Sequence, residues 1–62
     1  MPMSPRQFRR ALRQLRLSQV QAAQRLGVNA RTVRRWVAGA SRIPASVALV
    51  LQMWLRALPR RR

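Results

Sequence analysis

The stretch QVQAAQRLGVNARTVRRWVA, at residues 19–38, decides the fold of this chain. It contains two runs with apolar residues at helical spacing, and a short segment that begins with Gly27 and ends with Asn29 separates them. Glycine closes a helix by adopting a left-handed backbone, and asparagine caps the start of the helix that follows. The sequence therefore predicts two short helices, at residues 18–26 and 30–38.

The link between these helices sets how they meet. Because it is so short, the second helix cannot fold back antiparallel to the first, and the two must cross steeply, as in a helix-turn-helix. We expect the buried face of the first helix to consist of Val20, Ala23 and Leu26. The small Ala23 stands where the helices cross, since a larger side chain there would push them apart.

Two more helices are predicted outside this stretch. Ser4 opens a capping box that is followed by apolar residues at helical spacing, which predicts a helix at residues 5–15. A mostly apolar run bounded by prolines predicts a last helix at residues 44–58, ahead of a basic tail at 59–62. Because no strand pattern, linker or repeat appears, we expect residues 1–62 to form a single compact all-α domain of four helices.

The chain is unusually basic for its 62 residues. All 14 of its positively charged side chains are arginines, and it has no aspartate, glutamate, histidine, lysine or cysteine, so its formal net charge is +14. A chain that repels itself in this way needs a polyanion or high salt to offset its charge, and DNA, RNA and anionic lipid are the candidate polyanions. The side chains used for general acid–base catalysis and in the common metal sites are absent. We expect a binding protein with no enzymatic activity, no cofactor and no metal.

Several motif positions agree in register with one known family. The chain resembles lambda-repressor-like (XRE-type) helix-turn-helix domains over about residues 8–55, through Leu17-Ser18-Gln19, Ala23, Leu26-Gly27-Val28, Thr32-Val33, Trp36 and Gly39. This resemblance implies a lambda-repressor-like fold that binds double-stranded DNA. Together with the small size, it implies a transcriptional repressor of the kind that phages and mobile elements encode, acting in the bacterial cytoplasm or nucleoid.

In such a domain the second helix of the motif lies in the major groove and reads bases mainly from its N-terminal half. If Val33, Trp36 and Val37 point inward, the opposite stripe carries the candidates for base reading, which are Ala30, Arg31, Arg34 and Arg35. Arg31 and Arg35 are the first choices, because a guanidinium group forms two hydrogen bonds with guanine O6 and N7.

A second group of residues stands at the rim of this surface. Gln19 opens the first helix of the motif, where relatives place a glutamine against the DNA backbone and free amides favour a phosphate. The candidates for the DNA backbone or the rim are Gln19, Asn29, Thr32, Arg42, Arg9 and Arg10. Relatives also commonly join the first helix to the recognition helix by an Arg–Glu pair, which this acid-free chain cannot form. We therefore expect Arg9 and Arg10 to lack an internal partner and to remain available for phosphate.

The predicted last helix is apolar nearly all round, so we expect it to be buried on more than one face. One stripe, made of Val47, Val50, Leu51 and Trp54, packs on the other helices. The remaining apolar residues form a predicted two-fold homodimer interface, at Leu49, Met53, Leu55 and Leu58. Such a dimer reads an inverted-repeat operator with half-sites about 34–36 Å apart. The alternative is that Leu49 and Met53 are ordinary exposed apolar residues.

Three alternative functions remain open. A net charge of +14 also suits a protein that binds or condenses DNA or RNA without sequence preference, although that role does not require the turn motif. The amphipathic, arginine-rich segment at residues 5–15 resembles a membrane-active or targeting helix. A chain with that function has no use for a packed tryptophan such as Trp36. The third alternative is an antitoxin or adaptor that acts beside another protein. No apolar run is long enough for a membrane span, so no membrane partner is expected.

Overall fold

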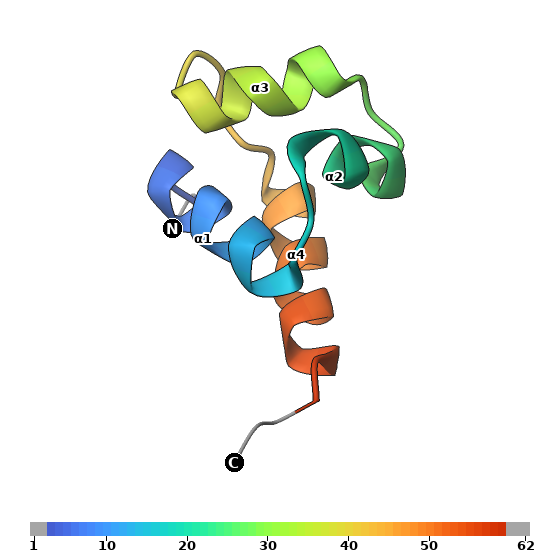
Figure 1. Cartoon of the computed structure of the whole chain (residues 1–62). Helices are drawn as coiled ribbons and strands as arrows, with labels where there is room; N and C mark the ends of the chain where they lie inside the picture. The colour runs from blue at the N-terminus through green and yellow to red at the C-terminus, as the bar shows by residue number, and fades with distance from the viewer. Residues whose placement is uncertain (1–2, 60–62) are drawn as a thin grey trace.

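A computed structural model describes residues 3–59 and shows four helices in them (Figure 1). The arginines of the predicted basic tail, at 60–62, lie outside the described residues. In chain order the helices are α1 (Pro5–Leu15), α2 (Gln19–Leu26), α3 (Ala30–Ala38) and α4 (Ala45–Ala57).

Helices α2 and α4 are slightly shorter than the sequence predicts, because the residues expected to start them serve as caps. Ser18 and Pro44 precede these helices with extended backbones. The Pro44 carbonyl still accepts the first helical N–H groups, from Val47 and Ala48, at 3.1 Å each. At the other end of α4, Leu58 is extended with ψ at 140°, since the residue before a proline disfavours the helical conformation.

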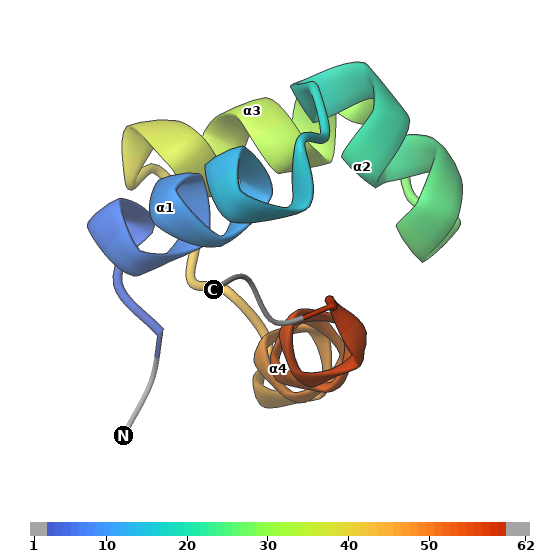
Figure 2. The ribbon, with the colours of Figure 1, turned by 60° about the horizontal axis from the view of Figure 1, so that its bottom comes forward.

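The helices form two layers. Helices α1, α2 and α3 lie together, and α4 lies below them, seen end-on in Figure 2. Helix α3 packs on both α1 and α2, whereas α4 packs mainly on α1. The C-terminal half of α4 extends away from α3 in Figure 1. The outer side of α3 and the far side of α4 are therefore separate parts of the surface.

Side-chain caps start the first three helices, including the two that the sequence predicts at Ser4 and Asn29. In α1, Ser4 Oγ accepts the Gln7 N–H at 3.1 Å, and the Gln7 side chain accepts the Ser4 N–H at 2.8 Å. The same reciprocal box recurs at the start of α2, where Ser18 is the cap. Helix α3 begins after Asn29, whose Oδ1 accepts the Arg31 N–H at 2.8 Å. These contacts fix the start of each helix of the motif.

Left-handed residues end the same three helices. Gly27 (φ 72°) ends α2, as the sequence predicts, and Gly39 (φ 78°) ends α3 in the same way. Helix α1 ends at Arg16, the one non-glycine residue with a positive φ (59°) in the described part of the chain. A side chain in this conformation costs about 1–2 kcal/mol, and nothing in the sequence around Arg16 indicated it.

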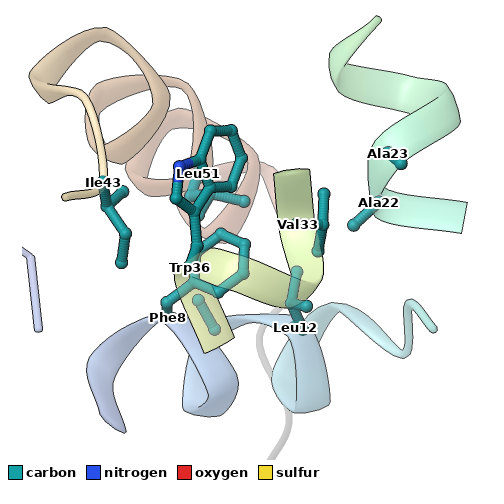
Figure 3. Packing of buried hydrophobic residues seen from close by; sticks show 9 residues of the cluster. Phe8, Leu12, Ala22, Ala23, Val33, Trp36, Ile43 and Leu51 are labelled. Atoms are coloured by element: carbon teal, nitrogen blue, oxygen red, sulfur yellow. The ribbon is translucent and has the colours of Figure 1, made fainter. Parts of the chain in front are cut away.

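The core lies where α1, α3 and α4 meet, and two alanines of α2 extend it along α3 (Figure 3). Phe8 and Trp36 contact each other edge to face, with ring centroids 5.7 Å apart. Val33 and Leu51 are fully buried, and Ile43 brings the loop after α3 into the same cluster. Phe8 and Trp36 are therefore core residues, and their buried rings are not platforms for stacking bases.

The predicted buried face of α2 is partly wrong. Val20 is 55% exposed, whereas Ala22 is fully buried beside Ala23. Both alanines belong to the core cluster, and their small side chains allow α2 to lie close against α3. Val20 stands two residues before Ala22, about 200° around the helix, so it points away from this contact.

Helix α4 buries one face and exposes the other. Leu51 is fully buried, and Trp54 packs against the core. Leu55, predicted for the dimer interface, is half-buried and also packs against the core, so it does not belong to the exposed face. Leu49 and Met53 are 58% and 60% exposed. No helix within the described residues has both the length and the apolar character to cross a membrane.

Candidate nucleic-acid interface

The outer face of α3 presents three arginines. Val33 and Trp36 are buried, so they fix which side of the helix faces the core. Arg31, Arg34 and Arg35 are exposed on the other side, at positions i, i+3 and i+4 that share one helical face. The structure therefore brings together the three arginines that the sequence predicts for base reading.

The smaller residues around this face are less open than expected. Ala30 and Thr32 are half-buried, and Ala30 packs against the core cluster because α3 starts directly after its turn from α2. Asn29 is exposed, but its Oδ1 is engaged in capping α3. Its side-chain NH2 group is the part that remains for a phosphate or base edge.

Arg35 has a contact that sequence reasoning missed. Its Nε donates to Ser41 Oγ at 3.1 Å, and the Ser41 N–H donates back to the Arg35 carbonyl at 3.4 Å. The contact orients the guanidinium through Nε and leaves the two terminal amino groups free, which are the groups that bind guanine side by side. No local rule indicates this pair, because the loop after α3 must first fold back over the end of the helix.

The start of α2 borders a second basic surface. Ser18 Oγ accepts the Gln21 N–H, so the N–H groups of Gln19 and Val20 at the helix start have no partner within the helix. A shallow hollow of about 330 Å³ lies there, lined by Arg9, Leu12, Arg13, Leu17, Ser18, Gln19 and Val37. A helix start beside two guanidinium groups suits a phosphate. Arg13 was missed as a site residue, although it follows Arg9 by one helical turn.

The expectation for Arg9 is wrong in one respect. Arg9 has an internal partner, because its Nη1 donates to the Val37 carbonyl oxygen at 3.1 Å. The absence of a carboxylate in the chain led to the opposite expectation, yet a backbone carbonyl at the end of a helix also accepts from a cation. Arg9 therefore contacts α3 and lines the hollow at the start of α2.

Arg10 and Arg42 lie apart from this hollow. Arg10 lines a separate groove between α1 and α4, together with Gln14 and Gln52. Its position does not join it to the outer face of α3. Arg42 is exposed in the loop after α3, beside Gly39, at the edge of another shallow hollow. Arg42 therefore lies close to the end of α3.

No arginine can be neutralised by an acidic side chain of the same chain. The sequence has no aspartate or glutamate, and every arginine in residues 3–59 is exposed. Arg25 lies 5.5 Å from the centre of the Trp54 ring, a cation–π contact that leaves its charge in place. The surface therefore attracts polyanions from all sides, while the ordered arginine stripe on α3 distinguishes one side.

Comparison with known proteins gives one family. A family model described as helix-turn-helix matches residues 8–52, which covers most of α1, all of α2 and α3, and most of α4. No curated protein and no solved structure matches the chain significantly. Four helices, with α2 packed on α3 across a short turn, together with this match, agree with the resemblance found in the sequence. The chain belongs to the XRE, or lambda-repressor-like, helix-turn-helix family, a family of DNA-binding domains that are typically non-catalytic and act in transcriptional regulation.

Proposed function

We propose that this chain is a transcriptional repressor that binds an inverted-repeat operator as a homodimer, with α3 of each copy in the major groove. The observation that carries the proposal is the exposed stripe of Arg31, Arg34 and Arg35 opposite the buried Val33 and Trp36. Burial on one side leaves α3 a single orientation, and that orientation presents arginines to a groove that displays guanine acceptors.

Within this stripe, Arg31 is the strongest candidate for base reading. It lies in the first turn of α3, which enters the groove deepest in helix-turn-helix domains, and Asn29 caps its N–H. Arg35 lies one turn later with its guanidinium oriented by Ser41. Arg34 stands between them and reaches either a base or a phosphate. The half-buried Ala30 contributes a small contact surface to this face.

Phosphate contacts frame the same face. Gln19 and the free N–H groups at the start of α2 are placed to hold one phosphate, with Arg9 and Arg13 beside them. Arg42 is placed for a second phosphate beyond the end of α3, while Asn29 and Thr32 lie at its start. Arg10 adds general attraction from the α4 side of α1.

The outer face of α4 is the proposed dimer interface. Leu49 and Met53 are well exposed, and Leu58 is 39% exposed just beyond the helix end. Helix α4 carries one arginine, Arg56, in 13 residues, so two copies meet there with less charge repulsion than at α1 or α3. A two-fold axis at this face uses the same patch on both copies, as an isologous interface requires.

The first experiment is a binding selection from random duplex DNA at physiological salt with competitor DNA present. We expect an enriched inverted repeat with half-site centres about one helical turn apart, and guanines at the positions that Arg31 and Arg35 reach. Enrichment of a single half-site would contradict the dimer. Absence of any enriched sequence would contradict the repressor.

A second candidate function is binding or condensing nucleic acid without sequence preference. The observation that favours it is the spread of exposed arginines over every helix, with no acidic side chain in the sequence. Such a protein binds random and selected duplexes equally, and its affinity falls steeply as salt rises. The same selection therefore separates the two functions. For the phage or mobile-element setting, and for action at the bacterial nucleoid, the support is family resemblance.

A further inference from the structure

The end of α3 leaves carbonyl groups that need donors from outside the helix. Backbone N–H groups that follow the helix turn back and bond to the carbonyls of Arg35 and Trp36. Among the described residues, no backbone N–H bonds to the next carbonyl, that of Val37. Arg9, in the middle of α1, supplies this donor, with its Nη1 3.1 Å from the Val37 oxygen. The last turn of α3 is thus capped by a side chain from another helix.

This bond is the one side-chain hydrogen bond that joins two helices within residues 3–59. The α1–α3 contact also includes the apolar edge-to-face pair of Phe8 and Trp36. Apolar contacts are non-directional, whereas a hydrogen bond fixes a distance and an angle. A cationic donor at a helix C-terminus also interacts favourably with the helix dipole. Arg9 therefore holds α3 against displacement along α1.

The same guanidinium borders the hollow at the start of α2. Arg9 lines it together with Arg13, Gln19 and Val37. A guanidinium group has five N–H donors in a rigid plane, and the Val37 carbonyl engages Nη1 alone. The remaining donors are available to an anion that enters the hollow.

We propose that Arg9 is a positioning residue that couples the grip on a DNA phosphate to the placement of α3. A phosphate beside Gln19 accepts from the free edge of the guanidinium, while Nη1 holds the Val37 carbonyl. Because the group is planar and rigid, the phosphate and the end of α3 take fixed positions relative to each other. The phosphate half of this inference rests on the proposed function, whereas the tether to α3 is a property of the free protein.

The chain offers a matched control in the next residue. Arg9 and Arg10 carry the same charge on the same helix, but Arg10 faces the groove between α1 and α4. Arg9→Gln and Arg10→Gln therefore remove equal charge, and only the first removes the tether. Arg9→Lys is a third variant, which keeps the charge and lacks the planar set of donors.

The first measurement is amide hydrogen exchange by NMR on the free proteins. We expect Arg9→Gln to speed amide exchange in the last turn of α3 about three- to tenfold, because loss of a charged hydrogen bond makes local opening of that turn easier. In Arg10→Gln these amides should exchange at the wild-type rate. Equal exchange in the two variants would overturn the tether, and with it the proposal.

The second measurement is the ratio of affinities for the selected duplex and a scrambled duplex. Arg10→Gln should weaken binding to both duplexes by the same factor. Arg9→Gln should lower the affinity ratio about three- to tenfold, because it removes the bond that positions α3. Arg9→Lys keeps the charge, so its affinity should depend on salt as that of the wild type does. Its affinity ratio should stay as low as that of Arg9→Gln. Restoration of the ratio by lysine would show that charge suffices and would overturn the coupling. A wild-type ratio of one would remove both the proposed function and the coupling, while the exchange data still decide the tether.

Discussion

Helices α3 and α4 belong to the same small domain, but contacts within the chain satisfy them to different degrees. Helix α3 has nine residues, a cap at each end, and polar residues on its exposed face. Helix α4 has 13 residues and no side-chain cap, and it exposes Leu49 and Met53 opposite the buried Leu51. The chain therefore uses nearly all the apolar surface of α3 and leaves part of that of α4 uncovered.

This difference between α3 and α4 shows which helix the small core of the chain holds in place. A domain of 62 residues has a small core, and here it spends that core on fixing the recognition helix. Phe8, Val33 and Trp36 hold α3 rigidly, so its arginines start from a defined position and lose less entropy on binding. In the proposed dimer, a second copy would add buried surface at the uncovered face of α4. In this proposal one chain carries the whole DNA-reading face, and the face of α4 requires a second chain.

The strongest way to break the comparison is to truncate a core residue of α3. Trp36 is 4% exposed and contacts Phe8, so Trp36→Ala should cost about 3–5 kcal/mol of unfolding free energy. That loss is comparable to the whole stability of a small domain, and we expect the variant to be largely unfolded at 25 °C. Thermal unfolding followed by circular dichroism measures it. Met53→Ala is the control. An equal loss of unfolding free energy in Met53→Ala at low protein concentration would contradict the contrast between α3 and α4.

The next largest effect concerns the exposed face of α3. Arg31→Ala should cost about 1–3 kcal/mol on the selected duplex and relax the base preference at one position, because it removes a bidentate contact. Fluorescence anisotropy on the selected duplex and on single-base variants measures both. Arg6→Ala removes the same charge from the exposed start of α1. It should weaken binding to all duplexes by one common factor, which is smaller than the loss that Arg31→Ala causes on the selected duplex. A uniform loss for Arg31→Ala as well would show that this residue contacts phosphate alone.

A third prediction tests the exposed face of α4. Met53→Lys places a charge on the proposed interface, and we expect it to weaken the dimer by about 1–2 kcal/mol, or roughly tenfold in the dimer dissociation constant. Sedimentation equilibrium measures the change, and half-maximal DNA binding should move to higher protein concentration. Gln52→Lys adds the same charge one residue earlier, on the side that faces the groove beside α1. A solution mass that Met53→Lys leaves unchanged contradicts the interface.

The parts of the fold that sequence reasoning predicted well are local. The caps at Ser4, Ser18 and Asn29 each involve residues two or three positions apart, so the sequence displays them directly. Gly27 and Gly39 mark helix ends for the same reason, since the backbone there requires a positive φ. The arginine stripe of α3 followed from helical periodicity once the inward side was assigned.

The parts that sequence reasoning missed depend on how helices meet. Whether Val20 or Ala22 faces α3 depends on the crossing of two helices, and both residues fit an apolar pattern. The bonds from Arg9 to Val37 and from Arg35 to Ser41 span 28 and six residues, and a side chain that binds a backbone carbonyl or a hydroxyl leaves no complementary charge in the sequence to indicate it. Periodicity predicts that a residue is exposed, and it does not show what an exposed arginine contacts.

The smallest expected effect isolates a difference between the starts of α3 and α4. Asn29 caps α3 with its side chain, whereas Pro44 precedes α4 without a side-chain hydrogen bond. Asn29→Ala should therefore cost about 1 kcal/mol of unfolding free energy, which corresponds to about 4–8 °C in Tm for a domain of this size. Asn29→Ser keeps an oxygen that accepts the Arg31 N–H, so it should unfold close to the wild-type temperature. Both variants lose the side-chain NH2 group proposed to face DNA. If Asn29→Ser binds the selected duplex as tightly as the wild type, the residue acts through the cap alone. If Asn29→Ser unfolds at as low a temperature as Asn29→Ala, the cap hydrogen bond does not stabilise α3. The difference between α3 and α4 then lies only in the residues that their outer faces expose.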